Sequence, residues 1–138
     1  VLGRHTKKVN NKEWTRTNHN LDLIVKQNKL IYGIEIKNTF PYMDKNEFDI
    51  KMKDMCEFLN IIPCAILRYA PKRWFFEIEE YNGFIWIFKS KIFPYGQENL
   101  IKDIWLKMKL PVAIWEEIPK KTQKRFLKWH NENKTAIQ

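Results

Sequence analysis

The chain has 138 residues, of which 44% are hydrophobic and 14% aromatic, and only four are glycine. This composition excludes an intrinsically disordered chain and predicts a single domain, residues 1–138, with a substantial hydrophobic core. Its 25 Lys and Arg residues outnumber its 16 Asp and Glu residues, so the formal net charge is +9. That excess favours a polyanionic partner such as nucleic acid, although a basic surface without a partner has the same composition.

Neither a membrane segment nor a zinc motif is visible. No apolar run approaches the roughly 20 residues that span a bilayer, and the first residues do not resemble a signal peptide. We therefore expect an intracellular, cytoplasmic protein with no membrane partner, in which Cys56 and Cys64 are reduced core thiols. The chain begins at Val1 rather than Met, which is consistent with a fragment or a processed product.

Residues 1–20 are polar and basic, and we predict that they form an N-terminal arm. If the arm binds nucleic acid, its cations contact phosphates; otherwise they are simply solvated. These cations include Lys7, Lys8, Lys12 and Arg16.

Two apolar runs follow, residues 21–26 and 30–37, and they are predicted to be the strands of a hairpin. The polar residues between them are typical of a turn, with Asn28 and Lys29 at its centre in the simplest register. Charged residues are unusual inside strands of this kind. The runs nevertheless contain Asp22, Glu35 and Lys37.

In this register Asp22 faces Glu35, and Lys37 lies on the same face as Glu35 because side chains alternate along a strand. Two opposed carboxylates destabilise a sheet unless a positive charge neutralises them. Mg²⁺ or Mn²⁺ suits such a pair, because each is commonly held by one or two carboxylates together with water and substrate phosphate. Alternatively, Glu35 and Lys37 form an exposed ion pair on an edge strand.

Asp22, followed after twelve residues by Glu35-Ile36-Lys37, resembles the active-site signature of the PD-(D/E)XK phosphodiesterase superfamily, which includes restriction endonucleases and Holliday junction resolvases. The resemblance covers roughly residues 20–70 and implies a restriction endonuclease-like core. It implies that Asp22 and Glu35 bind Mg²⁺, that the Ile36 carbonyl is a further ligand and that Lys37 assists the attacking water. Glu13 is the candidate for an additional acid, and a homodimer is consistent with the family.

A helix is predicted from about Lys45 to Leu59, with Asp44 as its N-cap and Glu47 completing a capping box. Its core-facing stripe consists of Phe48, Met52, Met55 and Leu59. Its remaining charged residues, among them Lys45, Lys51, Lys53 and Asp54, are expected on the surface. Lys45 and Lys53 are candidate DNA contacts.

Three elements are predicted between residues 61 and 93. Residues 61–69 are apolar and are expected to form a strand inside the sheet. Pro71 begins a helix that ends before Gly83, the expected C-cap. Residues 84–93 are expected to form another strand, whose aromatic residues belong to the core or stack on bases.

The remaining sequence predicts a helix from about Glu98 to Lys109, a short strand over residues 110–115 and a basic C-terminal helix within residues 119–138. In the middle helix, Leu100, Ile104 and Met108 repeat together with Ile101 and Trp105. In the last helix, Phe126, Leu127 and His130 are expected to face inward. Its cations, Lys120, Lys121, Lys124, Arg125 and Lys128, form either a contact for the phosphate backbone or a solubilising surface.

This order of elements predicts an α/β or α+β domain with one mixed sheet flanked by helices. The leading hypothesis is a Mg²⁺-dependent (or Mn²⁺-dependent) endonuclease that hydrolyses DNA phosphodiesters. One alternative is a non-catalytic nucleic-acid-binding module with a vestigial nuclease site. A second is a regulatory domain whose basic helix docks on an acidic protein.

Overall fold

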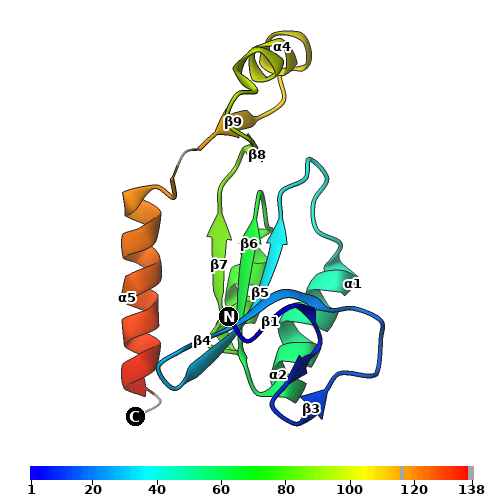
Figure 1. The fold of residues 1–138 in the computed structure, drawn as a ribbon, viewed down its shortest axis with the longest axis vertical. Helices are drawn as coiled ribbons and strands as arrows, with labels where there is room; N and C mark the ends of the chain where they lie inside the picture. The colour runs from blue at the N-terminus through cyan, green and yellow to red at the C-terminus, as the bar shows by residue number, and fades with distance from the viewer. Residues whose placement is uncertain (116, 137–138) are drawn as a thin grey trace.

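The computed structural model describes residues 1–115 and 117–136, which form a five-stranded sheet flanked by helices (Figure 1). The strands lie in the order β1 (Gly3–Thr6), β4 (Leu21–Gln27), β5 (Leu30–Lys37), β6 (Ile62–Leu67) and β7 (Phe84–Ile87). The first three pair with one another in antiparallel fashion, whereas β6 and β7 are added in parallel. The predicted mixed α/β class with a helix-flanked sheet is therefore confirmed. The described residues contain no helix that is both long and apolar enough to span a membrane.

The N-terminal segment is not the arm that we expected. Residues Gly3 and Thr6 pair with Ile24 and Leu21, so β1 is an edge strand of the main sheet. A small hairpin follows, made of β2 (Lys8–Val9) and β3 (Lys12–Glu13). Val9 and Trp14 are buried. These two apolar residues provide the burial that anchors an otherwise polar segment.

The β4–β5 hairpin has the predicted register, in which Gln27 pairs with Leu30. Asn28 takes a left-handed conformation, with φ of 56°. Asparagine tolerates this region better than most residues because its short polar side chain hydrogen-bonds locally. The turn therefore fixes which residues of the two strands face each other.

A single continuous helix connects β5 to β6 and runs through α1 (Lys45–Phe48), a π-helical segment η1 (Asp49–Met55) and α2 (Cys56–Leu59). The Asp44 side chain accepts hydrogen bonds from the backbone N–H groups of Asn46 and Glu47, which confirms the predicted N-cap. The predicted stripe of Phe48, Met52, Met55 and Leu59 is fully buried against the sheet.

α3 (Lys72–Glu79) packs on the same face of the sheet, and its Trp74 ring stacks on Phe48 at 4.2 Å between centroids. Gly83 is not the helix cap that we predicted. Asn82 has the left-handed backbone, with φ of 56°, and the Gly83 N–H bonds back to the Ile78 carbonyl. Gly83 is needed for close approach instead, because a Cβ atom there would lie 2.8 Å from the Pro63 carbonyl oxygen.

α5 (Lys120–Ala136) covers the opposite face of the sheet (Figure 1). His130 is buried as predicted and is hydrogen-bonded to the Tyr32 hydroxyl. Phe126 and Trp129 pack around the same tyrosine ring. Leu127 is 54% exposed, so the expectation that it faces inward is wrong. It lines a cavity between α5 and the sheet together with Phe126, and it is not packed into the core.

Beyond β7 the chain leaves the sheet and forms a projection, which we define as residues 89–115 (Figure 1). The single strand predicted over 84–93 is broken at Lys89, where φ is 65°, into β7 and β8 (Lys91–Phe93). β8 pairs in parallel with β9 (Val112–Ile114), and α4 (Glu98–Met108) connects the two. The helix and short strand that we predicted here are therefore present, but no residue from Lys89 to Trp115 is buried.

Candidate functional site

Asp22 and Glu35 come together near the C-terminal end of β5. The β4–β5 ladder ends with the pair Leu23–Ile34, and Asp22 and Glu35 are the next residue of each strand. The charge of Asp22 lies near enough to act on Glu35. At this point β4 no longer supplies a backbone acceptor to β5. The Ile36 N–H donates instead to Asp22 Oδ2, at 2.8 Å.

The backbone N–H of Ile36 points toward β4. The N–H and C=O groups of one strand residue point toward the same neighbouring strand. Because the Ile36 N–H reaches the Asp22 carboxylate, its carbonyl also points toward the β4 side. The Ile36 carbonyl therefore lies on the side of the strand from which Asp22 approaches.

Glu35 is the most deeply buried acid of this site, with 2% of its surface exposed. Its Oε1 atom accepts a hydrogen bond from Lys51 Nζ at 2.7 Å. Its Oε2 atom is buried and has no hydrogen-bond partner among the described residues. Burial raises the pKa of Glu35, and the charge of nearby Asp22 raises it further against the opposing influence of Lys51 and Lys37. Glu35 Oε2 is thus a buried carboxylate oxygen that lacks a hydrogen-bond donor among the described residues.

Lys51 was expected on the surface, and that expectation is wrong, because only 7% of the residue is exposed. Its ammonium lies between Glu35 Oε1 and Glu47 Oε1, at 2.7 and 3.0 Å. Burial opposes its charge, but the hydrogen bonds to these two carboxylates outweigh that effect and raise the pKa of Lys51. The π-helical segment carries this lysine, which is buried there together with Met52 and Met55.

Lys37 contacts Glu47, which is also the second carboxylate partner of Lys51. Its Nζ atom lies 3.0 Å from Glu47 Oε1, the oxygen that Lys51 also contacts. Burial opposes the charge on Glu47, yet the hydrogen bonds from both lysines prevail and lower its pKa. The Glu47 side chain therefore binds the two lysines. Of the two residues of the predicted capping box, Asp44 is the one whose side chain bonds to the helix start among the described residues.

Sequence reasoning missed Glu47 and Lys51 as site residues. Their spacing of four residues is the one local signal, because side chains at i and i+4 meet on a helix surface. We define the acidic cluster as Asp22, Glu35, Lys37, Glu47 and Lys51. It contains three carboxylates and two ammonium groups, and His5 Nδ1 lies 3.6 Å from Asp22 Oδ1 at its rim.

The possible additional acid, Glu13, does not join this cluster. It lies on β3 and pairs with Lys8 across the β2–β3 hairpin. Within residues 1–115 and 117–136, no group of three or more His, Cys, Asp or Glu side chains is arranged to hold one metal ion. A metal at this site would therefore rest on two carboxylates, Asp22 and Glu35, and on the Ile36 carbonyl.

The candidate DNA contacts on the first helix are already engaged in ion pairs. Lys45 and Lys53 both contact Asp49 and Glu77, and the Lys53 distances are 3.0 and 3.1 Å. Hydrogen bonds from Lys45 and Lys53 lower the pKa of Glu77. These two lysines join the helix to α3 and are less available to phosphates than the sequence suggested.

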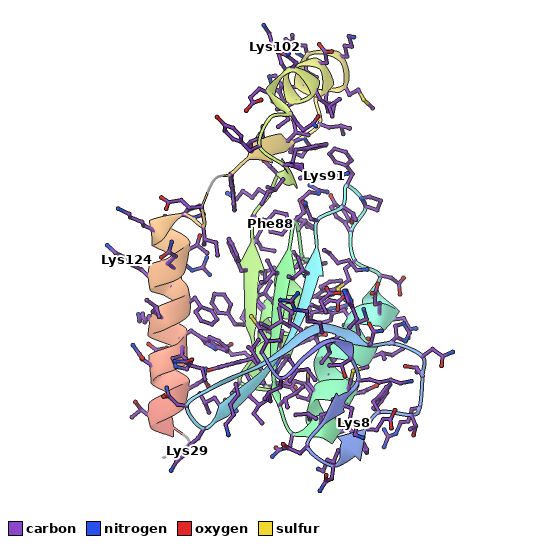
Figure 2. All side chains as sticks on the ribbon, viewed as in Figure 1. Lys8, Lys29, Phe88, Lys91, Lys102 and Lys124 are labelled. Carbon is purple, nitrogen blue, oxygen red and sulfur yellow. The ribbon has the colours of Figure 1, made fainter. Side chains whose placement is uncertain are left out.

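The basic row of α5 is exposed as predicted, but it lies away from the acidic cluster. We define this row as Lys120, Lys121, Lys124, Arg125 and Lys128. α5 covers the face of the sheet to which Tyr32 points, whereas Glu35 and Lys37 belong to the other face. Figure 2 shows Lys124 on the outer side of α5. The structure does not bring the basic row and the acidic cluster together on one surface.

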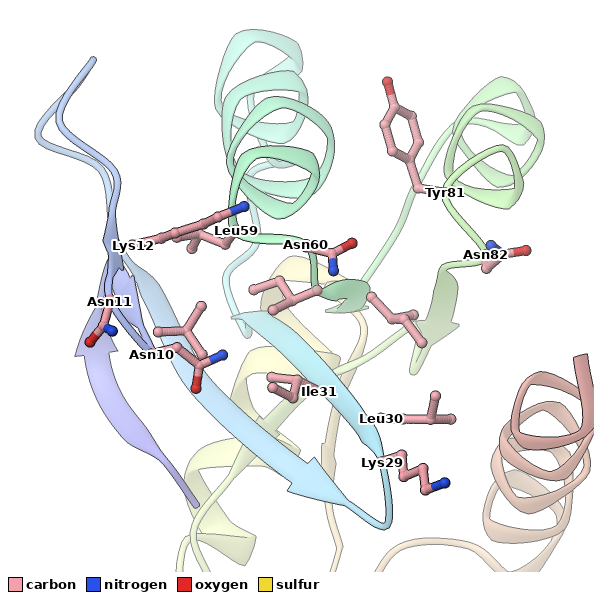
Figure 3. A pocket seen from close by; sticks show the side chains of 13 residues that line it. Asn10, Asn11, Lys12, Lys29, Leu30, Ile31, Leu59, Asn60, Tyr81 and Asn82 are labelled. Carbon is pink, nitrogen blue, oxygen red and sulfur yellow. The ribbon is translucent and has the colours of Figure 1, made fainter. Parts of the chain in front are cut away.

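A cavity of about 660 Å³ lies at the other end of β5, near the β4–β5 turn (Figure 3). Its polar lining comes from turn and hairpin residues, among them Asn10, Lys12, Lys29, Asn60 and Asn82. The lining includes the first residues of β5 and none of the acidic cluster. This cavity is therefore separate from the candidate site.

The chain was compared with known proteins by sequence and by structure. No protein-family model, curated protein or solved structure matches it.

Proposed function

We propose that this protein is a Mg²⁺-dependent endonuclease of the PD-(D/E)XK type that hydrolyses phosphodiester bonds in DNA. The observation that carries this proposal is the buried Glu35 Oε2 atom, which has no partner among the described residues and belongs to an acid close enough to Asp22 to feel its charge. A buried carboxylate oxygen without a partner costs about 1–3 kcal/mol or more. A cation between the two acids removes that cost.

The donor set fits a hard divalent cation. Mg²⁺ prefers oxygen ligands, keeps several waters and is commonly held by one or two carboxylates plus substrate phosphate. Asp22, Glu35 and the Ile36 carbonyl supply three such oxygens. Lys51 leaves Oε2 of Glu35 free by engaging Oε1, so the lysine fixes the orientation of the carboxylate without occupying the metal side.

When bound, such an ion polarises a phosphoryl oxygen and lowers the pKa of a coordinated water. The residues of the chain contribute position and charge. Glu47 holds the Lys37 ammonium at 3.0 Å, so Lys37 has a fixed place from which to orient a water or balance phosphate charge. Lys51 supports Glu35 and acts as a positioning residue.

The basic row of α5 provides phosphate contacts outside the acidic cluster in this proposal. Replacing Lys121 and Lys124 with alanine should weaken DNA binding. It should also reduce the slope of log K against log salt concentration by about 1 for each lysine that binds a phosphate. Cleavage at saturating DNA should change little, because the row lies on the other face of the sheet. Replacing Lys45 and Lys53 should affect DNA binding less, since both are paired with Asp49 and Glu77.

The decisive experiment compares Glu35→Gln with Glu57→Gln, because Glu57 is an exposed acid on the same continuous helix as Lys51. Plasmid, branched and single-stranded DNA are incubated with Mg²⁺, Mn²⁺ or EDTA. We expect cleavage that needs the metal, that is lost in Glu35→Gln and that persists in Glu57→Gln, while DNA affinity is kept in both. Metal-dependent cleavage by folded Glu35→Gln would reject the assignment.

One observation favours a second function, a nucleic-acid-binding module without catalysis. Lys51 and Lys37 already neutralise much of the acidic cluster, so the fold tolerates Glu35 without a metal. In that case the same assay shows salt-sensitive DNA binding but no cleavage with either metal. Absence of both binding and cleavage would leave only the interpretation that the basic helix docks on an acidic protein.

The cysteines support an intracellular setting for this activity. Cys56 and Cys64 are both free and buried, as expected of core thiols. Burial raises the pKa of Cys64 to about 12, so its thiol is unreactive at neutral pH. We accordingly propose that the protein works in the reducing cytoplasm.

A further inference from the structure

A second cavity, of about 590 Å³, lies between α5 and the sheet. Side chains of β5, β6 and β7 form its sheet wall, among them Ile34, Ile66, Phe84 and Trp86. These four side chains are only half-buried, although α5 covers this face of the sheet. The helix therefore does not close over the middle of the sheet, and an apolar space remains beneath it.

The cavity is closed on one side by aromatic packing and open on another. The Trp129 ring of α5 lies 5.4 Å from the Tyr32 ring and 5.0 Å from the Phe84 ring, measured between centroids. Ile118 and Leu127 also line the cavity, yet they are 48% and 54% exposed. A molecule in solution can therefore enter past these two residues and reach the aromatic wall.

The lining suits an apolar occupant better than water. An internal water needs about two to four polar partners. The polar side chains of the lining are Thr122, Gln123 and the thiol of Cys64, and Gln123 Nε2 already donates to the Ile118 carbonyl at 2.6 Å. Apolar walls around an unfilled space also lack dispersion contacts. The volume lies within the range of about 300–1,000 Å³ that is typical of small-molecule sites.

A positive charge lies at the edge of this apolar cavity. The Arg125 guanidinium lies 5.7 Å from the centroid of the Phe84 ring, which belongs to the sheet wall. The residues that line the cavity include no acid. Arginine binds carboxylates with two parallel hydrogen bonds, so it favours a ligand that carries this group. The cavity and its edge together match an apolar body with one anionic end.

We propose that the cavity binds a small molecule with an apolar body and one carboxylate, of the kind represented by a medium-chain fatty acid. The apolar body fills the space between Trp86 and Phe126, and the carboxylate pairs with Arg125. A nucleobase suits the lining less, because its edges carry donors and acceptors that the apolar walls leave unpaired. The site lies on the other face of the sheet from the acidic cluster, so it does not depend on the proposed nuclease activity.

The test is isothermal titration calorimetry of the full chain with butanoate, hexanoate, octanoate and the uncharged octan-1-ol. We expect octanoate to bind with a stoichiometry of one per chain. The dissociation constant should fall by about tenfold for each two CH₂ groups added, because each enters an apolar environment. Octan-1-ol should bind more weakly than octanoate, since it cannot form the ion pair.

Two kinds of variant locate the site. Ile66→Trp and Leu127→Trp fill the cavity from its two walls, and each should weaken octanoate binding at least tenfold while circular dichroism shows a folded chain. Arg125→Gln should weaken octanoate binding by about 3- to 10-fold and leave octan-1-ol binding unchanged. Arg73→Gln is the matched control, because Arg73 is an exposed arginine of α3, which packs on the other face of the sheet.

Three results would overturn the proposal. One is octanoate that binds no more tightly than butanoate, because a basic surface alone would then account for carboxylate binding. Another is octanoate affinity that is kept in the folded Leu127→Trp variant. The third is equal weakening of octanoate binding by Arg125→Gln and Arg73→Gln.

Discussion

The sheet body and the projection both contain an amphipathic helix but differ in what covers its apolar face. The helix through α1, η1 and α2 buries Phe48, Met52 and Met55 completely. The amphipathic α4 buries none of its residues. The body even encloses two charged side chains, Glu35 and Lys51. The apolar stripe of a helix thus identifies the face that is suited to burial. Whether that face is buried depends on the other elements that pack against the helix.

The largest expected effect on the free energy of unfolding comes from the buried ion pair of the sheet body, Glu35 and Lys51. Lys51→Met leaves the Glu35 carboxylate buried without its cation, and such a change typically costs about 3–5 kcal/mol in the free energy of unfolding. Lys102→Met in the exposed α4 should change it by less than about 0.5 kcal/mol. Urea unfolding of both variants measures the difference.

The paired control for that prediction is the double variant Glu35→Gln, Lys51→Met. Because it removes both charges, it should recover most of the stability that Lys51→Met loses. If Lys51→Met alone costs no more than Lys102→Met, the ion pair contributes little to the fold, and Lys51 is not the partner that holds Glu35.

A matched pair of methionines gives the next effect. Met52 is completely buried and Met108 is 63% exposed. Met52→Ala should cost about 2–5 kcal/mol because it removes a packed side chain and leaves a cavity. Met108→Ala should cost less than about 0.5 kcal/mol, because most of this side chain is already exposed to solvent. Equal losses at the two positions would show that the projection has cover within its own chain.

The hairpin, the N-cap at Asp44 and the buried stripe of the first helix were predictable from sequence, because each depends on residues close together in the chain. Asn28 specifies a turn, the turn sets the register, and the register brings Asp22 and Glu35 to the end of the same strand pair. The central feature of the candidate site therefore followed from local rules. The strand at Gly3–Thr6 did not, since four residues with one glycine carry too little alternation to distinguish a strand from an arm.

The features that sequence reasoning missed depend on contacts between distant segments. Lys51 is buried because Glu35, sixteen positions earlier, lies beneath it, and no local pattern contains that fact. Lys45 and Lys53 are neutralised by Glu77 of a different helix. The amphipathic pattern of α4 predicted a helix correctly. It contained no information on whether this helix packs against the sheet.

The two helix starts give a smaller effect. Asp44 accepts two backbone hydrogen bonds at the start of α1, whereas Gln97 at the start of α4 makes no side-chain capping bond. Asp44→Ala should therefore lower the free energy of unfolding by about 1 kcal/mol, and Gln97→Ala should leave it nearly unchanged. Thermal unfolding followed by circular dichroism measures both. A comparable loss in the two variants would mean that the Asp44 bonds do not stabilise the helix.

The smallest effect is a difference in pH dependence within the acidic cluster. Because burial raises the pKa of Glu35, the folded protein binds this proton more tightly than the unfolded chain, so acidification through that pKa adds stability at Glu35. Glu47 has a lowered pKa, so its contribution is lost as the pH falls through the folded value. Compared with the wild type, Glu35→Gln should therefore lose stability more steeply on acidification and Glu47→Gln less steeply, as measured by urea unfolding between about pH 7 and pH 4. Changes of slope in the same direction for both variants would contradict the separate roles given to these carboxylates, one desolvated and one held by two lysines.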